Sequence, residues 1–265
     1  MEILSLFENL EIDADLHRMI IDKSDPETIY IIAITPRSGS SYLSSIMRNS
    51  KLMGSPSELL PPAFMKNILK RIPAKNPDEY LRNVLKKTQT NNKVAGLKAS
   101  WFQFKRFINT LEDRSVLTKF KYIYLYRRDV VQQAVSLYKA TESNLFHTNI
   151  DHSEDTIEKA KNLEYSYEKI KKWKERIERG EREWLNFFRD NKIHPLTITY
   201  EQVDFDVSDC MRSIAEYLNV ESKSRFEVPA IFKKLRDRQS LEYACQFSLD
   251  FYDELKQKEV HSDSL

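Results

Sequence analysis

Four short runs of apolar and β-branched residues, separated from one another by helical patterns, constrain the fold of this chain most strongly. Continuous apolar runs of this length are typical of strands that are covered on both faces of a sheet. Strands that alternate with helices predict a parallel α/β sheet. The runs are TIYIIAIT (28–35), KVAGLK (93–98), KYIYLY (121–126) and PLTITY (195–200).

The helical patterns between these runs have recognisable start signals. One pattern begins near Ser40 and ends near Asn49, and another covers about residues 130–140. Asn76 is the expected N-cap of a further helix, because Pro77 follows at the first helical position and Glu79 at the third. These signals place helices between the predicted strands.

Residues 153–190 form the longest helical pattern, with apolar residues at spacings of three and four between charged ones. We expect an amphipathic helix, or two helices broken near Gly180, packed on the sheet. A dimer interface or an acceptor wall on the aromatic stripe is the less favoured interpretation. Another helix is expected over 206–218, opened by Asp206 as its cap.

The length of 265 residues suits one large α/β domain over 1–265, with a frayed tail at 256–265. The formal net charge is only +2, which argues against nucleic acid or an anionic membrane as the main partner. The N-terminus lacks the pattern of a signal peptide, and no stretch is apolar enough to span a bilayer. Cys210 and Cys245 belong to no metal-binding pattern. We therefore expect a cytoplasmic protein without a metal site.

The segment TPRSGSSYL (35–43) joins the first predicted strand to a helix. Backbone N–H groups at a helix start have no partner within the helix and attract anions. Gly39 lets the backbone approach a bound oxygen, and Arg37 adds a forked cation. Hydroxyl donors come from Ser38, Ser40 and Ser41. The segment predicts an oxyanion cradle.

Two alternative interpretations of this segment are less favourable. A Walker A loop requires an earlier glycine and a lysine after the second glycine, and both are missing here. An ordinary turn that caps a helix does not require an arginine at the end of a buried strand. The loop is shorter than a Walker A loop and has Arg37 before its Ser-Gly-Ser run, so a single phosphosulfate fits it better than a triphosphate does.

A second basic segment, YRRDVVQQAVS (126–136), follows the third predicted strand. Arg127 and Arg128 come at the strand end, and Ser136 lies about two turns into the next helix. Taken alone, a surface ion-pair group and a phosphate site are equally good interpretations. Together with the first loop the phosphate site gains, because open α/β sheets bind ligands at the carboxyl ends of their strands.

The turn GSPSELL (54–60) places Glu58 just after Pro56. A carboxylate near a donor group can accept the proton of an attacking alcohol. From the sequence alone, a helix-cap glutamate is the simpler interpretation.

Together these motifs resemble the PAPS-dependent sulfotransferases of the trehalose 2-sulfotransferase-like family, where PAPS is 3′-phosphoadenosine 5′-phosphosulfate. The resemblance extends over about residues 29–250 and rests on four segments taken in combination. They are TPRSGSSYL (35–43), GSPSE (54–58), GLKASW (96–101) and RRDVVQQAVS (127–136).

The resemblance implies a P-loop-like α/β fold, with helices on both faces of the sheet, and PAPS as the sulfuryl donor. It implies that residues from Arg37 to Ser41 bind the 5′-phosphosulfate. The 3′-phosphate is expected at Arg128 and Ser136, with Arg127 adjacent. It makes Glu58 the general base. Tyr200, in ITYEQV, is similar to a residue near the nucleotide in many sulfotransferases.

In the implied mechanism, Arg37 and the loop N–H groups stabilise charge on the leaving nucleotide. Lys98, at a strand end, either reaches the transferring sulfuryl or faces solvent. No metal is expected. The family's Gln-Thr-Gly-x-Trp run is replaced by ESNLF (142–146), which leaves the acceptor open among small carbohydrates, glycolipids and other alcohols. A homodimer is compatible with the family.

Some features of the expected site have no clear counterpart in the sequence. The Gly-rich C-terminal nucleotide loop of vertebrate cytosolic sulfotransferases is not recognisable here, and either Arg236 or Arg238 is a candidate to supply its charge. The rival functions are a kinase-like P-loop protein, which requires a loop lysine and a metal carboxylate, and a nucleotide-binding module without sulfuryl transfer.

Overall fold

The computed structural model describes residues 2–8, 10–146, 153–221 and 237–262. The chain divides into two compact units, which are considered separately. The first comprises Met1–Tyr126 and Gly180–Pro229, and the second comprises Arg127–Arg179 and Ala230–Leu265. The prediction of one domain over 1–265 stays a prediction.

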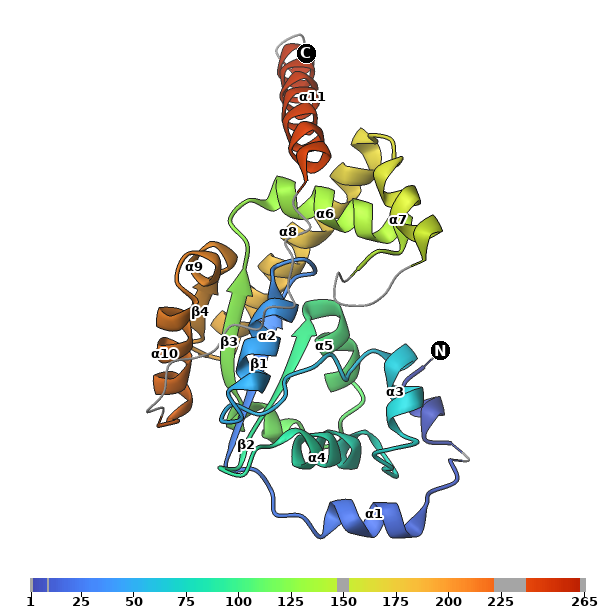
Figure 1. Cartoon of the computed structure of the whole chain (residues 1–265), viewed down its shortest axis with the longest axis vertical. Helices are drawn as coiled ribbons and strands as arrows, with labels where there is room; N and C mark the ends of the chain where they lie inside the picture. Colours follow the sequence, from blue (N-terminus) through green and yellow to red (C-terminus); the bar gives the residue numbers. More distant parts are fainter. Residues whose placement is uncertain (1, 9, 147–152, 222–236, 263–265) are drawn as a thin grey trace. The chain divides into compact units, whose positions relative to one another are not determined.

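The first unit contains a four-stranded parallel sheet with the order β2-β1-β3-β4, so β2 and β4 are its edges (Figure 1). Every strand lies within or beside a predicted run, which confirms the parallel α/β class. The strands are β1 (Thr28–Ile34), β2 (Val94–Ser100), β3 (Lys121–Tyr126) and β4 (Leu196–Thr199).

The helices of the first unit follow several of the predicted start signals. Asn76 caps α4 by accepting from the backbone N–H of Glu79 at 2.8 Å, and Asp206 caps α10 in the same way through Asp209. The helices are α1 (Ala14–Ile21), α2 (Ser40–Asn49), α3 (Pro62–Ile68), α4 (Pro77–Thr88), α5 (Trp101–Ile108), α9 (Tyr200–Phe205), α10 (Val207–Leu218) and the second half of α8 (Tyr167–Asp190), with 3₁₀ turns η1 (Leu4–Leu6) and η2 (Arg114–Lys119).

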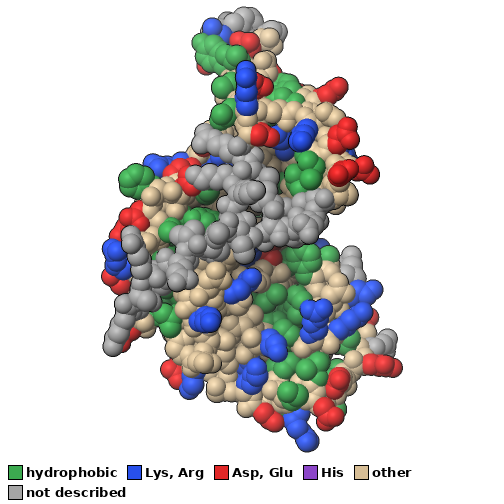
Figure 2. All heavy atoms as spheres, viewed as in Figure 1, with side chains coloured by type: hydrophobic (Ala, Val, Ile, Leu, Met, Phe, Trp, Pro, Cys, Tyr) green, Lys and Arg blue, Asp and Glu red, His purple; other side chains and the backbone are tan. Residues whose placement is uncertain are grey.

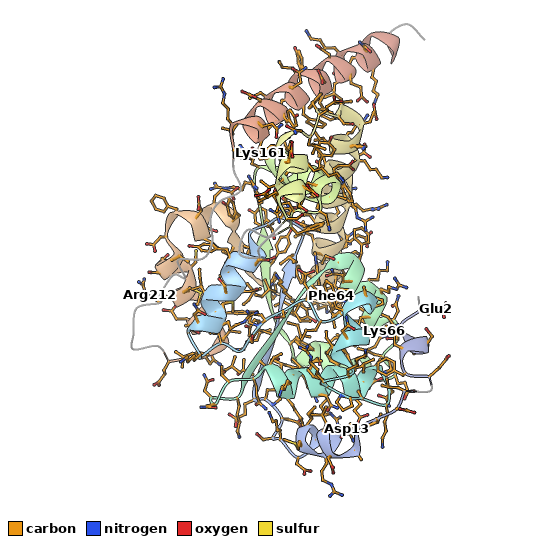
Figure 3. All side chains as sticks on the ribbon, turned by 45° about the vertical axis from the view of Figure 1, so that its right-hand side comes forward. Glu2, Asp13, Phe64, Lys66, Lys161 and Arg212 are labelled. Atoms are coloured by element: carbon orange, nitrogen blue, oxygen red, sulfur yellow. The ribbon has the colours of Figure 1, made fainter. Side chains whose placement is uncertain are left out.

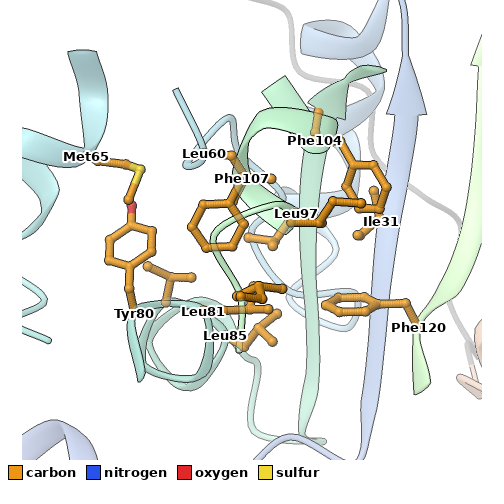
Figure 4. Close-up of a cluster of buried hydrophobic side chains, with 14 of the residues drawn as sticks. Ile31, Leu60, Met65, Tyr80, Leu81, Leu85, Leu97, Phe104, Phe107 and Phe120 are labelled. Atoms are coloured by element: carbon orange, nitrogen blue, oxygen red, sulfur yellow. The ribbon is translucent and has the colours of Figure 1, made fainter. Parts of the chain in front are cut away.

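Alternate residues of β1 bury their side chains on opposite faces of the sheet, as the strand period requires. Ile31 and Ala33 belong to a core with α4, α5 and the end of α8 (Figure 4). Tyr30, Ile32 and Ile34 belong to a second core with α2 and α10. The sheet is therefore covered by helices on both faces, which confirms the expected α/β class.

The second unit is helical in its described part, with α6 (Val130–Ser143), α7 (Glu154–Lys161), the first half of α8 and α11 (Arg238–Ser262). Its core joins side chains of α6, α8 and α11, including Tyr138, Ile170 and Phe247. The tail over 256–265, expected to be frayed, is helical as far as Ser262.

The alternative of a helix break near Gly180 is wrong. The chain leaves the helix between α7 and α8, at residues 162–166, and α8 continues through Gly180. Tyr138 on α6 donates its hydroxyl to the carbonyl of Glu164 at 2.6 Å, and Tyr243 on α11 donates to that of Leu163. These contacts replace the helical hydrogen bonds that the break removes.

The charged side chains are distributed over the surface. Figure 2 shows Lys and Arg side chains spread over one face of the first unit, with Asp and Glu around its rim. Among the described residues, no helix is both long enough and apolar enough to cross a membrane.

Candidate functional site

The loop between β1 and α2 has the conformation of an anion cradle. Arg37 and Gly39 both have positive φ angles, 66° and 81°. A left-handed arginine is unusual, and such strain is concentrated at functional sites. Ser38 is buried in the loop, Ser40 is buried as the first residue of α2, and Ser41 after it is half-buried. The loop therefore leads into the first N–H groups of α2, which have no partner within the helix and can bind an anion.

Tyr200 lies against this loop. A Cβ atom added at Gly39 would be 2.5 Å from Cδ2 of the Tyr200 ring. The ring is held at the start of α9 by a capping box, in which Thr199 and Gln202 exchange side-chain and backbone hydrogen bonds at 2.8 and 3.1 Å. The structure thus places Tyr200 against the loop, and its expected contact with the nucleotide stays a prediction.

Helix α8 fixes the strand end from which the loop begins. The buried Trp184 donates its indole N–H to the carbonyl of Ile34 at 3.1 Å. A Cβ added at Gly180 would lie 3.3 Å from Cγ2 of Thr35, so α8 needs a small residue where it passes the loop. Neither contact was predicted from the sequence. A lone glycine inside a strongly amphipathic helix was the available signal for a close approach.

The turn that carries Glu58 is attached to the edge strand β2. The backbone N–H of Lys98 donates to the carbonyl of Ser57 at 3.1 Å. Gly54, with a φ of 71°, packs so tightly that an added Cβ would lie 3.0 Å from the carbonyl oxygen of Val94. Arg48 on α2 donates to Ser55 at 2.7 Å and to Ser57 at 3.1 Å. Glu58 is therefore held beside β2, and it does not cap α3, whose N-cap is Pro61.

Lys98 lies between the cradle and this turn. Its Nζ donates to Ser41 Oγ at 3.1 Å and lies 3.4 Å from Glu58 Oε1. Only 7% of Lys98 is exposed, so the interpretation as a solvent-facing lysine is wrong. Burial lowers the pKa of Lys98 from its ordinary value of 10.5, and the nearby Glu58 carboxylate opposes part of that shift.

The second carboxylate oxygen of Glu58 has its own partner. Gln103 on α5 donates its amide Nε2 to Glu58 Oε2 at 3.0 Å. Four side chains thus form a continuous line of contacts, which we call the Lys98 cluster and which consists of Ser41, Glu58, Lys98 and Gln103. The Glu58 carboxylate, which can accept a proton, and the Lys98 ammonium thus lie next to the anion cradle. Gln103 was not among the site residues predicted from the sequence.

The basic segment after β3 belongs to the second unit. Asp129 caps α6, and Arg127 donates to Gln132 at 3.0 Å. Arg128 is exposed, and Ser136 is half-buried on α6. The convergence of these groups on one phosphate stays a prediction.

Of the C-terminal arginines, Arg238 is paired with Glu242 at 2.8 Å, and Arg236 lies outside the described residues. In the described part of the chain, no group of three or more His, Cys, Asp or Glu side chains is placed to hold a metal ion.

The sequence model of the Stf0 sulphotransferase family matches residues 29–250. No curated protein matches this chain significantly.

Similar solved structures include mouse sulfotransferase SULT7A1 complexed with PAP, at 14% identity and a TM-score of 0.38, covering 89% of this chain and 70% of that one. The sulfotransferase domain of the Synechococcus PCC 7002 olefin synthase has 15% identity and a TM-score of 0.44, with 86% and 96% covered. The sulfotransferase domain from the curacin biosynthetic pathway has 15% identity and a TM-score of 0.42, with 85% and 99% covered.

Proposed function

Because this chain belongs to the Stf0 sulphotransferase family, we propose that it moves the sulfuryl group from PAPS to a hydroxyl group of its acceptor. The observation that carries the proposal is the placement of Lys98 between Ser41 of the cradle and the carboxylate of Glu58. A donor group on the cradle and a base beside it are the two requirements of this reaction.

The cradle suits a phosphosulfate. Gly39 has a positive φ that favours glycine, so no Cβ stands in the loop at this point, and the α2 N-terminus supplies N–H donors. We assign the 5′-phosphosulfate to Arg37, Ser38, Gly39, Ser40 and Ser41. The Ser38 hydroxyl is buried and has no hydrogen-bond partner in the described part of the chain, which leaves a donor available in the loop.

The other nucleotide contacts follow from the family pattern. The 3′-phosphate is assigned to Arg127, Arg128 and Ser136, and Tyr200 is assigned to the nucleotide. The contact of Tyr200 with Gly39 supports that last assignment.

In the proposed transfer, an acceptor oxygen forms a bond to sulfur while the bond from sulfur to the bridging phosphate oxygen breaks. The electron pair of the broken bond stays on PAP. Glu58 accepts the acceptor proton and passes it to solvent. Arg37 and Lys98 stabilise the negative charge that develops on the transferring group and the leaving oxygen.

The acceptor is proposed to be a small carbohydrate, a glycolipid or another alcohol, as for a member of the trehalose 2-sulfotransferase type. Action as a homodimer in the cytoplasm, without a metal, is part of the same proposal. The rival is a kinase-like or purely nucleotide-binding protein. The buried Lys98 beside Glu58 favours transfer over mere binding, because a carboxylate base has no role in a binding module.

Thermal unfolding with ligands separates these functions. We expect PAP to raise the melting temperature more than ATP with Mg²⁺ does, because a ligand that binds the folded state stabilises it. Arg37→Ala should lose this stabilisation. Arg212→Ala is the matched control, since Arg212 is an exposed α10 residue paired with Asp209 at 2.8 Å (Figure 3). Stabilisation by ATP alone, or an undiminished PAP effect in Arg37→Ala, would overturn the donor assignment.

Turnover tests the base. Glu58→Gln should still bind PAP and should release PAP from PAPS about 10²-fold more slowly or worse in the presence of an acceptor. A Glu58→Gln variant with full turnover removes Glu58 from the mechanism.

A further inference from the structure

The carboxylate of Glu58 has two different neighbours. Oε1 faces the Lys98 ammonium at 3.4 Å, whereas Oε2 accepts a hydrogen bond from Gln103 at 3.0 Å. Charged N–H···O contacts are ordinarily about 2.7–2.9 Å long. The ion pair is therefore loose, and the amide makes the closer contact with the carboxylate.

The orientation of the Gln103 amide is fixed by a second contact. Gln103 occupies the third position of α5, and its Oε1 accepts from the backbone N–H of Ser100 at 2.9 Å. Because the amide oxygen faces the Ser100 N–H in this capping box, the amide nitrogen points away from Ser100. The nitrogen is then directed at Glu58.

The position of this capping box couples it to Lys98. Ser100 is the last residue of β2, two residues after Lys98, and α5 starts immediately after it. One strand end thus supplies both the cation at Oε1 and the support for the donor at Oε2. A glutamate side chain has several rotatable bonds, and without the amide it is free to turn both oxygens toward Lys98. A tight, two-oxygen ion pair would occupy the lone pairs needed to accept a proton.

We propose that Gln103 is a positioning residue that holds Glu58 in the orientation of a working base and prevents its collapse onto Lys98. The inference rests on the proposed function, in which Glu58 accepts the acceptor proton. In this role Gln103 acts through Glu58 and not by direct contact with the acceptor or the donor.

A purely structural role for Gln103, as the cap of α5, makes a different prediction. Gln103→Glu keeps an oxygen for the Ser100 N–H but replaces the donor to Glu58 with a like charge. Gln103→Met keeps the side-chain length and loses both contacts. If capping is the whole role, Gln103→Glu behaves as wild type and only Gln103→Met is impaired.

The chain offers a matched control. Gln202 occupies the same third position in the capping box of α9, where its Oε1 accepts from Thr199 at 2.8 Å. Gln202→Glu makes the same chemical change in the same motif and, in the described structure, without a Glu58 contact. The change in stability of Gln202→Glu measures the effect of a Gln→Glu substitution on a capping box alone.

The first measurement needs no acceptor. The full chain carrying ¹³C-labelled glutamate carboxyl groups shows one resonance that Glu58→Gln removes, which identifies Glu58. We expect this resonance to move in both Gln103→Glu and Gln103→Met and to stay in place in Gln202→Glu. Thermal unfolding should show Gln103→Met less stable than wild type, because it loses both contacts. An unmoved Glu58 resonance in Gln103→Glu overturns the inference.

The second measurement is kinetic, with PAPS and an acceptor identified by product mass. Gln103→Glu should lower kcat by about tenfold to a hundredfold, as misplacement of a catalytic group does, and leave the KM for PAPS unchanged. An unchanged kcat contradicts the positioning role if Glu58→Gln is inactive. Full activity of Glu58→Gln instead contradicts the proposed function, so the two failures are distinguishable.

Discussion

Gly39→Ala perturbs the cradle at its most constrained point. Gly39 has a φ of 81°, and a left-handed residue with a Cβ costs about 1–2 kcal/mol. The new methyl group would also lie 2.5 Å from Cδ2 of Tyr200, so the ring must move. Overpacking of this kind costs about 1–3 kcal/mol. We expect the free energy of unfolding to fall by roughly 2–5 kcal/mol in total.

Urea unfolding measures this loss, and titration with PAP measures its effect on the cradle. PAP affinity should fall at least about tenfold, because both the loop backbone and Tyr200 are displaced. Gly180→Ala is the matched control. Its Cβ would lie 3.3 Å from Thr35 Cγ2, inside a helix in which alanine is favoured by about 1 kcal/mol.

A double-mutant cycle isolates the contact with the ring. In a Tyr200→Ala background, Gly39→Ala should cost only the backbone term of about 1–2 kcal/mol. The reasoning is refuted if Gly39→Ala costs the same in both backgrounds. It is also refuted if Gly39→Ala matches Gly180→Ala in stability and in PAP affinity.

Further predictions concern Lys98 and Trp184. Lys98→Met should slow transfer by about 10²-fold in a PAP-release assay without loss of folding, and undiminished transfer would exclude Lys98 from charge stabilisation. Burial lowers the pKa of Lys98 in the folded state, so the unfolded chain binds that proton more tightly. The free energy of unfolding of the wild type should therefore rise as pH increases from the lowered pKa toward 10.5. Urea unfolding of Lys98→Met should lack this rise. Trp184→Phe leaves the buried Ile34 carbonyl without its donor and should cost about 1–3 kcal/mol in urea unfolding, whereas an unchanged midpoint would mean that the bond has no net value.

The local patterns of the sequence predicted the sheet and the loop. The run 121–126 is β3 to the residue, and the pattern near 40–49 is α2, because apolar runs and cap signals act over a few neighbouring residues. The combination of Arg37 and Gly39 with a following helix indicated the cradle for the same reason. These features depend on the chain only locally.

The rest of the site depends on tertiary packing. Nothing in the sequence says that β2 is an edge strand, and the contact of Ser57 with the Lys98 backbone requires that edge. The burial of Lys98 and its position beside Glu58 both depend on this contact. In the sequence, nothing distinguishes Gln103 from an ordinary helical residue. The need for a small residue at position 180 of α8 likewise comes from Thr35, which is far away in the chain.

The most direct test of the central claim is transfer itself. The protein is incubated with PAPS and a panel of polar metabolites, and mass spectrometry searches for a product heavier by about 80 Da, the mass of SO₃. We expect one class of hydroxyl compounds to gain this mass, with one PAP released per product and with the yield nearly abolished in Glu58→Gln. If PAPS binds but no member of the panel is sulfated and no PAP is released, the claim of sulfuryl transfer is contradicted.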